Sequence, residues 1–174
     1  MRKRIKMFFL LAPLFLTLAR SHRDNVSYKD DVRKSLEQAD LKDVTVSEDQ
    51  DKNTITLGGR VHSSDAKAKA VDVDVAKTAA NTRIIANEIS VEPVGSESQA
   101  KDVASNLDDG IEKDYKAALI SSGLDKQHVR FEAKNRVLTL TGSVHNTNER
   151  HQAERLAVGI PNVQQVLNQI EVRR

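Results

Sequence analysis

The side chains most capable of chemistry in this sequence are five histidines, His22, His62, His128, His145 and His151. His145 and His151 are near enough to share one metal site in a loop and the helix after it. A metal site, however, needs several ligands that converge on the ion and are held by further hydrogen bonds. No His-x-x-x-His or Glu-x-x-His spacing occurs in the chain. We therefore expect no metal site.

Two pairs of neighbouring carboxylates, Asp30-Asp31 and Asp108-Asp109, are the candidates for acid–base work. Each pair is predicted to open a helix, where the helix dipole favours a negative charge. Helix capping therefore explains them better than catalysis. The chain also has no Gly-x-Ser-x-Gly motif, phosphate loop or other nucleophile motif. The sequence predicts a protein that is not an enzyme, with no catalytic residues and no cofactor.

The composition narrows the classes of function further. The chain has 27 Lys and Arg against 25 Asp and Glu, and four of the basic residues precede Met7, so the remainder has 23 against 25. Beyond the first twenty residues the aromatic residues are Tyr28, Tyr115 and Phe131, and this near-neutral, aromatic-poor body does not have the basic stripe of a nucleic-acid binder. The absence of Cys excludes disulfides, Cys-based zinc sites and a lipid-modified cysteine anchor.

The first 19 residues have the pattern of a secretory signal peptide. The basic run Arg2–Lys6 precedes the uncharged and mostly apolar run Met7–Ala19, which ends in small residues. A membrane-spanning helix needs about 20 apolar residues, and this run is shorter and contains Pro13. We expect cleavage after Ala19 and export to the periplasm as a soluble protein with no membrane span. An uncleaved signal anchor is the alternative.

An internal repeat organises the rest of the chain. Ile55–His62 aligns with Leu138–His145 at an offset of 83 residues, and Asn87–Val91 aligns with Asn168–Val172 at an offset of 81. Between the copies, the sequence from Glu92 to Ser98 has the composition of a linker. The predicted divisions are a first domain at 24–92, a linker at 93–105 and a second domain at 106–173.

Hydrophobic spacing predicts the first elements of each copy. Apolar residues at helical spacing predict an opening helix, at Tyr28, Val32, Leu36 and Ala39 and again at Ile111, Tyr115 and Leu119. Apolar and polar residues then alternate over 44–57 and 129–140 on either side of a polar turn, which predicts a β-hairpin in each copy. Gly59 and Gly142 are predicted to end the second strand, where a positive φ favours glycine.

A second helix and a last strand are predicted to complete each copy. Asn146 is a suitable N-cap with Glu149 three residues on. In the first copy Val71–Val75 alternates like a strand, but the alignment favours a helix. Asn81 and Asn162 are the predicted turn residues that stop the second helices, and Val91 and Val172 close the last strands. The predicted fold is α+β, with two repeated α-β-β-α-β sandwich domains and helices on one face of a small three-stranded sheet.

The outward positions of the predicted strands are polar. These positions are Thr45, Thr54, Thr56, Arg130, Thr139, Thr141 and Glu171. The face that they share is therefore either in contact with water or packed against the other domain.

These segments resemble the BON domain. The resemblance is carried by the repeated L-x-G-x-V segment, the preceding helix Asp108–Leu119 and the closing x-N-x-I-x-V strand. Two copies behind a signal peptide are similar to the osmotically inducible periplasmic protein family. The resemblance implies α/β sandwiches without a catalytic centre, a place in the periplasm or envelope, and binding to phospholipid surfaces or client proteins, with a role in osmotic stress. Family members that are lipoproteins have a cysteine after the signal peptide, so this chain is closer to the soluble members.

The partners expected from this resemblance are anionic phospholipid or envelope and client proteins, bound in a chaperone-like way. If lipid is contacted, the second copy is the better candidate, through Lys113, Lys116, Arg150 or Arg155. Acidic residues lie between these cations, which is also the pattern of a solvated helix face. Two other hypotheses remain open: a structural or assembly adaptor that binds a protein partner through its sheet faces and edges, and an enzyme acting on a small ligand or through a metal.

Overall fold

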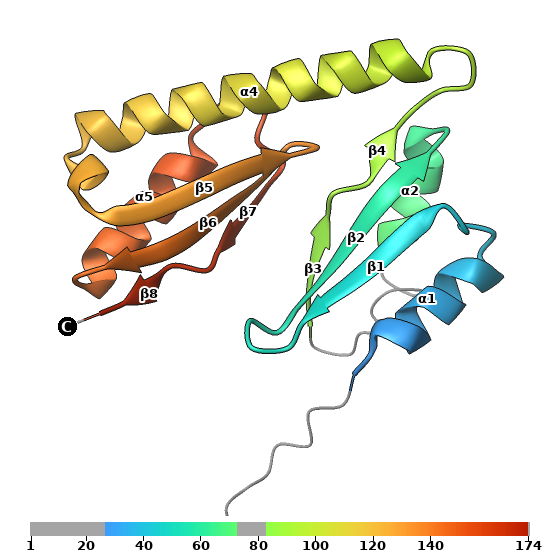
Figure 1. Cartoon of the computed structure of the whole chain (residues 1–174), viewed down its shortest axis with the longest axis horizontal. Coiled ribbons are helices and arrows are strands. Elements are labelled where there is room, and N and C mark those ends of the chain that lie inside the picture. Colours follow the sequence, from blue (N-terminus) through green and yellow to red (C-terminus); the bar gives the residue numbers. More distant parts are fainter. Residues whose placement is uncertain (1–26, 73–82, 174) are drawn as a thin grey trace, which may run out of the picture.

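The computed structural model describes residues 27–72 and 83–173, which form an α+β protein with two small sheets (Figure 1). The predicted signal peptide and Asn81 lie outside these residues. We call residues 27–92 the first half and residues 106–173 the second half. The elements before the second half begins are α1 (Lys29–Gln38), β1 (Val44–Asp49), β2 (Thr54–Val61), α2 (Ser64–Val71), β3 (Ile84–Asn87), β4 (Ser90–Val91) and the start of α4 (Glu97–Ser121).

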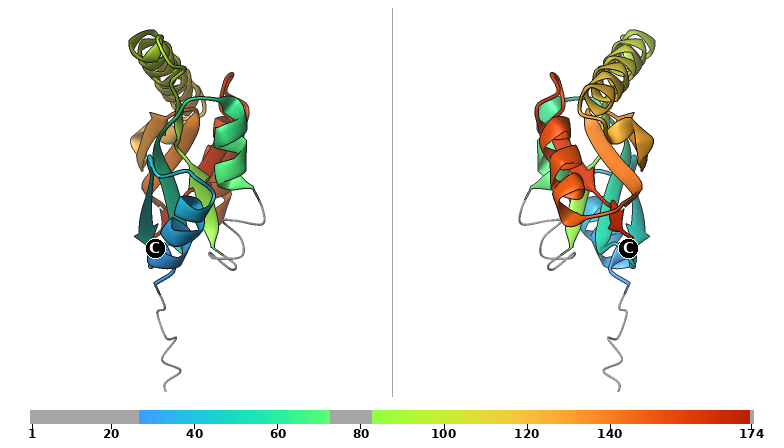
Figure 2. Two further views of the ribbon diagram at one scale, coloured as in Figure 1. Left: turned by 90° about the vertical axis from the view of Figure 1, so that its right-hand side faces the viewer. Right: turned by 90° about the vertical axis from the view of Figure 1, so that its left-hand side faces the viewer.

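The second half contains the rest of α4 and one further helix. After α4 come a short 3₁₀ turn (Leu124–Lys126), β5 (His128–Lys134), β6 (Val137–Val144), α5 (Thr147–Val158), β7 (Gln165–Asn168) and β8 (Glu171–Val172). Figure 2 shows α2 and α5 on the same side of the molecule, while α4 runs along its upper edge.

Both sheets have the same strand pairing. β1 is antiparallel to β2, and β3 and β4 are parallel to β2; β5, β6, β7 and β8 repeat these relations. The three-stranded sheet predicted from the sequence is therefore wrong in one respect, because the last strand is divided into two short strands. The register continues across the division, since Leu57 pairs with Asn87 and Arg60 with Ser90.

An asparagine side chain causes each division of the last strand. The Oδ1 atom of Asn87 accepts the backbone N–H of Ile89 at 3.4 Å, and Asn168 does the same for Ile170 at 3.2 Å. Asparagine side chains commonly take a backbone N–H two residues on in this way. Ile89 and Ile170 are both buried, so the turn keeps each isoleucine in the core of its half.

The buried core of each half lies between its helices and its sheet. In the first half the core joins α1 and α2 to β1 and β2 through the buried residues Val32, Leu36, Leu41, Val44, Val46, Ile55, Leu57, Val61, Ala70 and Ile89. In the second half it joins α4 and α5 to β6 through Ile111, Tyr115, Leu119, Leu124, Leu138, Leu140, Val144, Ala153, Ala157 and Ile170. Burial of these apolar side chains is the main stabilising contribution in each half.

The opposite sheet faces are partly in contact with each other. A small cluster of Ala86, Val137 and Leu167 is buried between the two halves, and Thr54 of β2 is only 4% exposed. Thr45, at the outer strand of the first sheet, remains exposed. The polar sheet face is therefore packed against the other half near β3 and β7. At Thr45 on β1 it is in contact with water.

Two glycines have the positive φ that the sequence suggested, although neither ends its strand. Gly59 has a φ of 85° and Gly142 a φ of 95°, and both lie inside their strands. A Cβ at Gly142 would overlap the carbonyl oxygen of His128 on the neighbouring strand, and one at Gly59 would overlap that of Asp43. These close approaches, and not a strand end, require glycine.

The helices differ from the predictions mainly at the start of α4. This helix begins at Glu97, so residues 97–105 of the predicted linker are helical. α2 covers Ser64–Val71, so of the described part of the segment Val71–Val75 only Val71 is helical; Asp72 has left the helix, and 73–75 lie outside the described residues. α5 begins after Asn146, whose Oδ1 accepts the N–H of Glu149 at 3.0 Å.

Candidate functional site

Two of the four cations predicted to contact lipid share one exposed face of α4. Lys113 and Lys116 are both exposed, and Ile120, one turn farther on, is 56% exposed. Residues three or four apart in a helix are neighbours on its surface. The C-terminal part of α4 therefore presents two ammonium groups next to an apolar side chain.

The other two predicted cations lie on α5 and differ from each other. Arg155 is exposed in the last turn of the helix. Arg150 is half-buried, and its Nη2 donates to the carbonyl oxygen of Asn168 at 3.4 Å. Its Nε is buried with no hydrogen-bond partner among the described residues. Arg150 is thus held against the end of β7 and is not part of an open surface.

The two carboxylate pairs have different surroundings. Asp30 and Asp31 lie in the first turn of α1, as predicted. The prediction that Asp108 and Asp109 open a helix is wrong, because α4 starts eleven residues before Asp108, at Glu97. The residues from Ala100 to Leu107 also have apolar side chains at helical spacing, and they belong to the same helix.

Asp108 instead binds the turn between β5 and β6. Its Oδ2 accepts the backbone N–H of Asn135 at 2.7 Å, and its Oδ1 accepts that of Arg136 at 2.8 Å. Both turn residues have positive φ, 47° and 69°, as in the type I′ turns that close two-residue hairpins. Arginine is strained in this conformation, and the two hydrogen bonds that the Asp108 carboxylate accepts from the backbone of the turn stabilise it.

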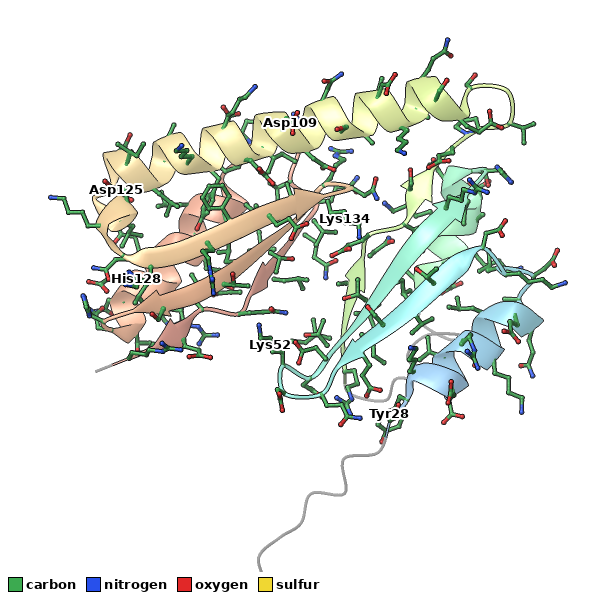
Figure 3. All side chains as sticks on the ribbon, viewed as in Figure 1. Tyr28, Lys52, Asp109, Asp125, His128 and Lys134 are labelled. Atoms are coloured by element: carbon green, nitrogen blue, oxygen red, sulfur yellow. The ribbon has the colours of Figure 1, made fainter. Side chains whose placement is uncertain are left out.

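The same turn joins the two halves of the molecule. The Nδ2 of Asn135 donates to the carbonyl oxygen of Glu88 at 2.7 Å, and the carboxylate of Glu88 forms an ion pair with Lys134 at 2.9 Å. At the far end of the contact, the Nζ of Lys52 donates to the side chain of Gln169 at 2.9 Å. Lys134 and Lys52 lie between the halves in Figure 3.

A glutamine side chain closes the edge of the first sheet. The Nε2 of Gln165 donates to the carbonyl oxygen of Ile85 at 2.9 Å, and its Oε1 accepts the N–H of Asn87 at 3.1 Å. The carboxamide thus supplies the two hydrogen bonds that another strand would make with β3. Unpaired strand edges favour aggregation, so this contact also protects the edge.

A pocket of about 710 Å³ lies between the halves, under the N-terminal part of α4. Its apolar wall on α4 is made by Ala100, Val103, Ala104 and Leu107, at the spacing i, i+3, i+4 and i+7. The wall opposite includes Ile89 and Val91 of the last strand of the first half, with Ala68 of α2, and Asn135, Arg136 and Gln164 of the second half.

The pocket contains an unbalanced positive charge. Among the described residues that line it, Lys67 and Arg136 are the charged ones. Burial lowers the pKa of Lys67 below its ordinary value, and the nearby Arg136 guanidinium lowers it further, while Asp108 acts in the opposite direction. Both oxygens of Asp108 accept backbone N–H groups of the turn, and no ion pair between Asp108 and Lys67 is seen in the described part of the chain.

Sequence reasoning did not identify this pocket. The apolar spacing of residues 100–107 was a readable signal of a helix face, but the polar composition of 92–98 favoured a linker. Lys67 and Arg136 belong to different halves, so only their relative placement brings them to one cavity.

The histidines are dispersed. His62 has its Nδ1 3.0 Å from the carbonyl oxygen of Glu92, His145 donates its backbone N–H to Glu149, and His151 lies 3.9 Å from Glu154. In residues 27–72 and 83–173, no group of three or more His, Cys, Asp or Glu side chains is arranged to hold a metal ion.

No helix in the described part of the chain has both the length and the apolar composition to cross a bilayer.

Comparison with known proteins identifies one domain. Residues 107–174 match the family model of the BON domain. No curated protein matches the chain. Two solved structures of CdsD, a structural protein of the type III secretion system of Chlamydia trachomatis, have low similarity to this chain. The first, its C-terminal domain, has 14% identity and a TM-score of 0.35 and covers 86% of this chain and 98% of that one. The second has 16% identity and the same TM-score and covers 83% and 91%.

Proposed function

We propose, on the premise that residues 107–174 match a BON domain, that this is a non-enzymatic binding protein of the cell envelope that contacts anionic phospholipid surfaces. BON domains are thought to bind phospholipids. The contact is assigned to the C-terminal part of α4, where Lys113, Lys116 and Ile120 share an exposed face.

This face carries the proposal because it combines the two features that an interfacial helix requires. Ammonium groups interact with headgroup phosphates, and each Lys or Arg near an anionic leaflet contributes about 1 kcal/mol. An exposed large apolar side chain enters the boundary between headgroups and acyl chains. Asp109 lies one turn before Lys113 and Asp114 lies between the two lysines in the chain, whereas no acidic residue follows from Tyr115 to Ile120.

The finer parts of the proposal concern the whole chain. Two halves with the same strand pairing support two copies of one sandwich fold, of which the second is matched by the family model. Export to the periplasm, binding of client proteins and a role in stress protection follow from the resemblance to the osmotically inducible periplasmic proteins and belong to the same proposal.

Co-sedimentation with vesicles tests the function directly. The full chain is mixed with vesicles of phosphatidylglycerol and phosphatidylcholine, or of phosphatidylcholine alone, at low and high salt. We expect binding to the anionic vesicles at low salt, and weaker binding at high salt. Absence of binding to anionic vesicles at low salt would remove the proposal.

A further inference from the structure

The pocket under α4 has the features of a site for a molecule that is apolar at one end and anionic at the other. The stripe Ala100, Val103, Ala104 and Leu107 faces the space between the halves, and Val103 remains 59% exposed. A helix in a folded protein usually packs such a stripe against another element. Here small side chains on α2 and α4, Ala68, Ala100 and Ala104, leave the space open.

The size of the pocket agrees with binding of a small molecule. Its volume of about 710 Å³ lies within the range of about 300–1,000 Å³ that small-molecule sites occupy. Apolar side chains with a few polar groups are the usual lining of such sites. The slot between α4 and the last strand of the first half is therefore suited to a hydrocarbon chain.

The charged residues that line the pocket indicate which kind of headgroup would fit. Lys67 and Arg136 approach the same cavity from α2 and from the β5–β6 turn, and neither has an ion-pair partner among the described residues. Arg136 is oriented by its Nε, which donates to the carbonyl oxygen of Asn162 at 2.8 Å. The carboxylate of Asp108, whose charge acts on Lys67, accepts two backbone N–H groups of the turn. An anionic group would complete this arrangement with charge-assisted hydrogen bonds.

We propose that the pocket binds a single-chain lipid with an anionic headgroup, with its chain along Ala100, Val103, Ala104 and Leu107 and its headgroup on Lys67 and Arg136. This site is separate from the surface of Lys113, Lys116 and Ile120, so the inference goes beyond the proposed contact with a bilayer. It assigns a function to the predicted linker, because the N-terminal part of α4 forms the apolar wall.

Titration with oleoyl lysophosphatidate below its micelle concentration tests the site, with monooleoylglycerol as the neutral comparison. The full chain should bind the phosphate lipid saturably with one molecule per chain. The neutral lipid should bind about tenfold or more weakly, since it lacks hydrogen bonds to a charged group. Each methylene removed from the chain should weaken binding by about fourfold. Equal binding of the two lipids, or no saturable binding, would overturn the proposal.

Matched variants locate the site. Lys67→Gln should weaken lysophosphatidate binding by about tenfold or more, whereas Lys69→Gln, two residues along α2, should leave it unchanged. Ala104→Trp fills the slot and should abolish binding, with circular dichroism to check the fold. If Lys67→Gln and Lys69→Gln bind equally, the assignment is wrong even where Ala104→Trp fails to fold. Vesicle binding by Ala104→Trp should equal that of the wild type, so loss of the pocket and loss of the surface contact are distinguished.

Discussion

The two halves of the molecule share one strand pairing but stabilise it differently. In the second half Tyr115 and Phe131 form an edge-to-face pair with ring centroids 5.1 Å apart. In the first half Val32 corresponds to Tyr115, which lies 83 residues later in the chain. Val46 corresponds to Phe131, because Val46 pairs with Leu57 on β2 as Phe131 pairs with the equivalent Leu140 on β6. Conserving the pairing of strands therefore does not require conserving the side chains that fill the core.

The first half has an ion pair where the second has an apolar residue. On β1, Glu48 is paired with Ile55 of β2. The equivalent position on β5 is Ala133, which is paired with Leu138 of β6. Glu48 lies 3.2 Å from Arg83, and their side chains are 5% and 8% exposed. Arg83 also lies 5.2 Å from the centre of the Tyr28 ring. The core of the first half, which lacks the aromatic pair, is thus supplemented by polar contacts, and these make its stability sensitive to pH.

The largest effect is expected from the aromatic pair. Tyr115→Ala removes a fully buried ring and should cost about 3–5 kcal/mol of unfolding free energy. Val32→Ala removes fewer buried atoms and should cost less. Urea unfolding followed by circular dichroism measures both. Equal losses would contradict the difference between the two cores. Tyr115→Phe, which removes the hydroxyl that donates to Ala153 O at 3.2 Å, should cost about 1 kcal/mol.

The next largest effect is expected at Glu48. Glu48→Gln removes the buried carboxylate that pairs with Arg83 and accepts hydrogen bonds from Ser27 and Tyr28, and it should cost about 3 kcal/mol at neutral pH. Burial raises the pKa of Glu48, but hydrogen bonds from Ser27 and Tyr28 and the charge of Arg83 outweigh it, so the pKa is lowered.

The sign of the pH dependence follows from this lowered pKa. The contribution of Glu48 is present above the ordinary carboxyl pKa of 4.5 and is lost as the pH falls through the lower pKa of the folded state. Acid titration of stability should show that the difference between wild type and Glu48→Gln decreases below pH 4.5. A difference that does not change with acid would contradict the assignment.

A smaller effect is expected at the turn between the halves. Asp108→Ala removes the acceptor of two backbone N–H groups and should cost about 1–3 kcal/mol. Its neighbour Asp109 is exposed, so Asp109→Ala should change stability by less than about 0.5 kcal/mol. Thermal unfolding of the two variants provides the comparison. Equal melting temperatures would show that the turn does not depend on the carboxylate.

The smallest effect is expected at the edge of β3. Gln165→Ala should cost about 1 kcal/mol and should increase hydrogen exchange at the N–H of Asn87. Gln164→Ala, at the exposed neighbouring position, is the control and should not change this exchange. Unchanged exchange at Asn87 in Gln165→Ala would mean that the carboxamide does not protect the edge.

The sequence carried most of the information on the elements within each half. Alternation around 44–57 and 129–140 predicted both hairpins, because one face of each strand must be buried. The start of α4 was missed because the polar residues of 92–98 outweighed the apolar spacing from Ala100 to Leu107. At the division of the last strand the side-chain oxygen of Asn87 or Asn168 accepts a backbone N–H, and hydrophobic spacing does not report this hydrogen bond.

The contacts between the halves could not be predicted in the same way. Asp108 was interpreted from its neighbours in the chain, but its partners are the backbone N–H groups of Asn135 and Arg136, brought close by the packing of α4 on β5. Gln165 and Lys67 are likewise ordinary polar residues in sequence, and their roles arise from segments of the other half. Lys113 and Lys116 are exposed, while Arg150 is half-buried against the end of β7.

One measurement tests the central claim that the second half contacts anionic lipid. Binding to phosphatidylglycerol vesicles at low salt is compared for the double variants Lys113→Gln/Lys116→Gln on α4 and Lys29→Gln/Lys34→Gln on α1, which remove the same charge from exposed positions of the two halves. The account predicts that the α4 variant binds about tenfold or more weakly while the α1 variant binds as the wild type does. Equal binding of the two double variants would contradict it.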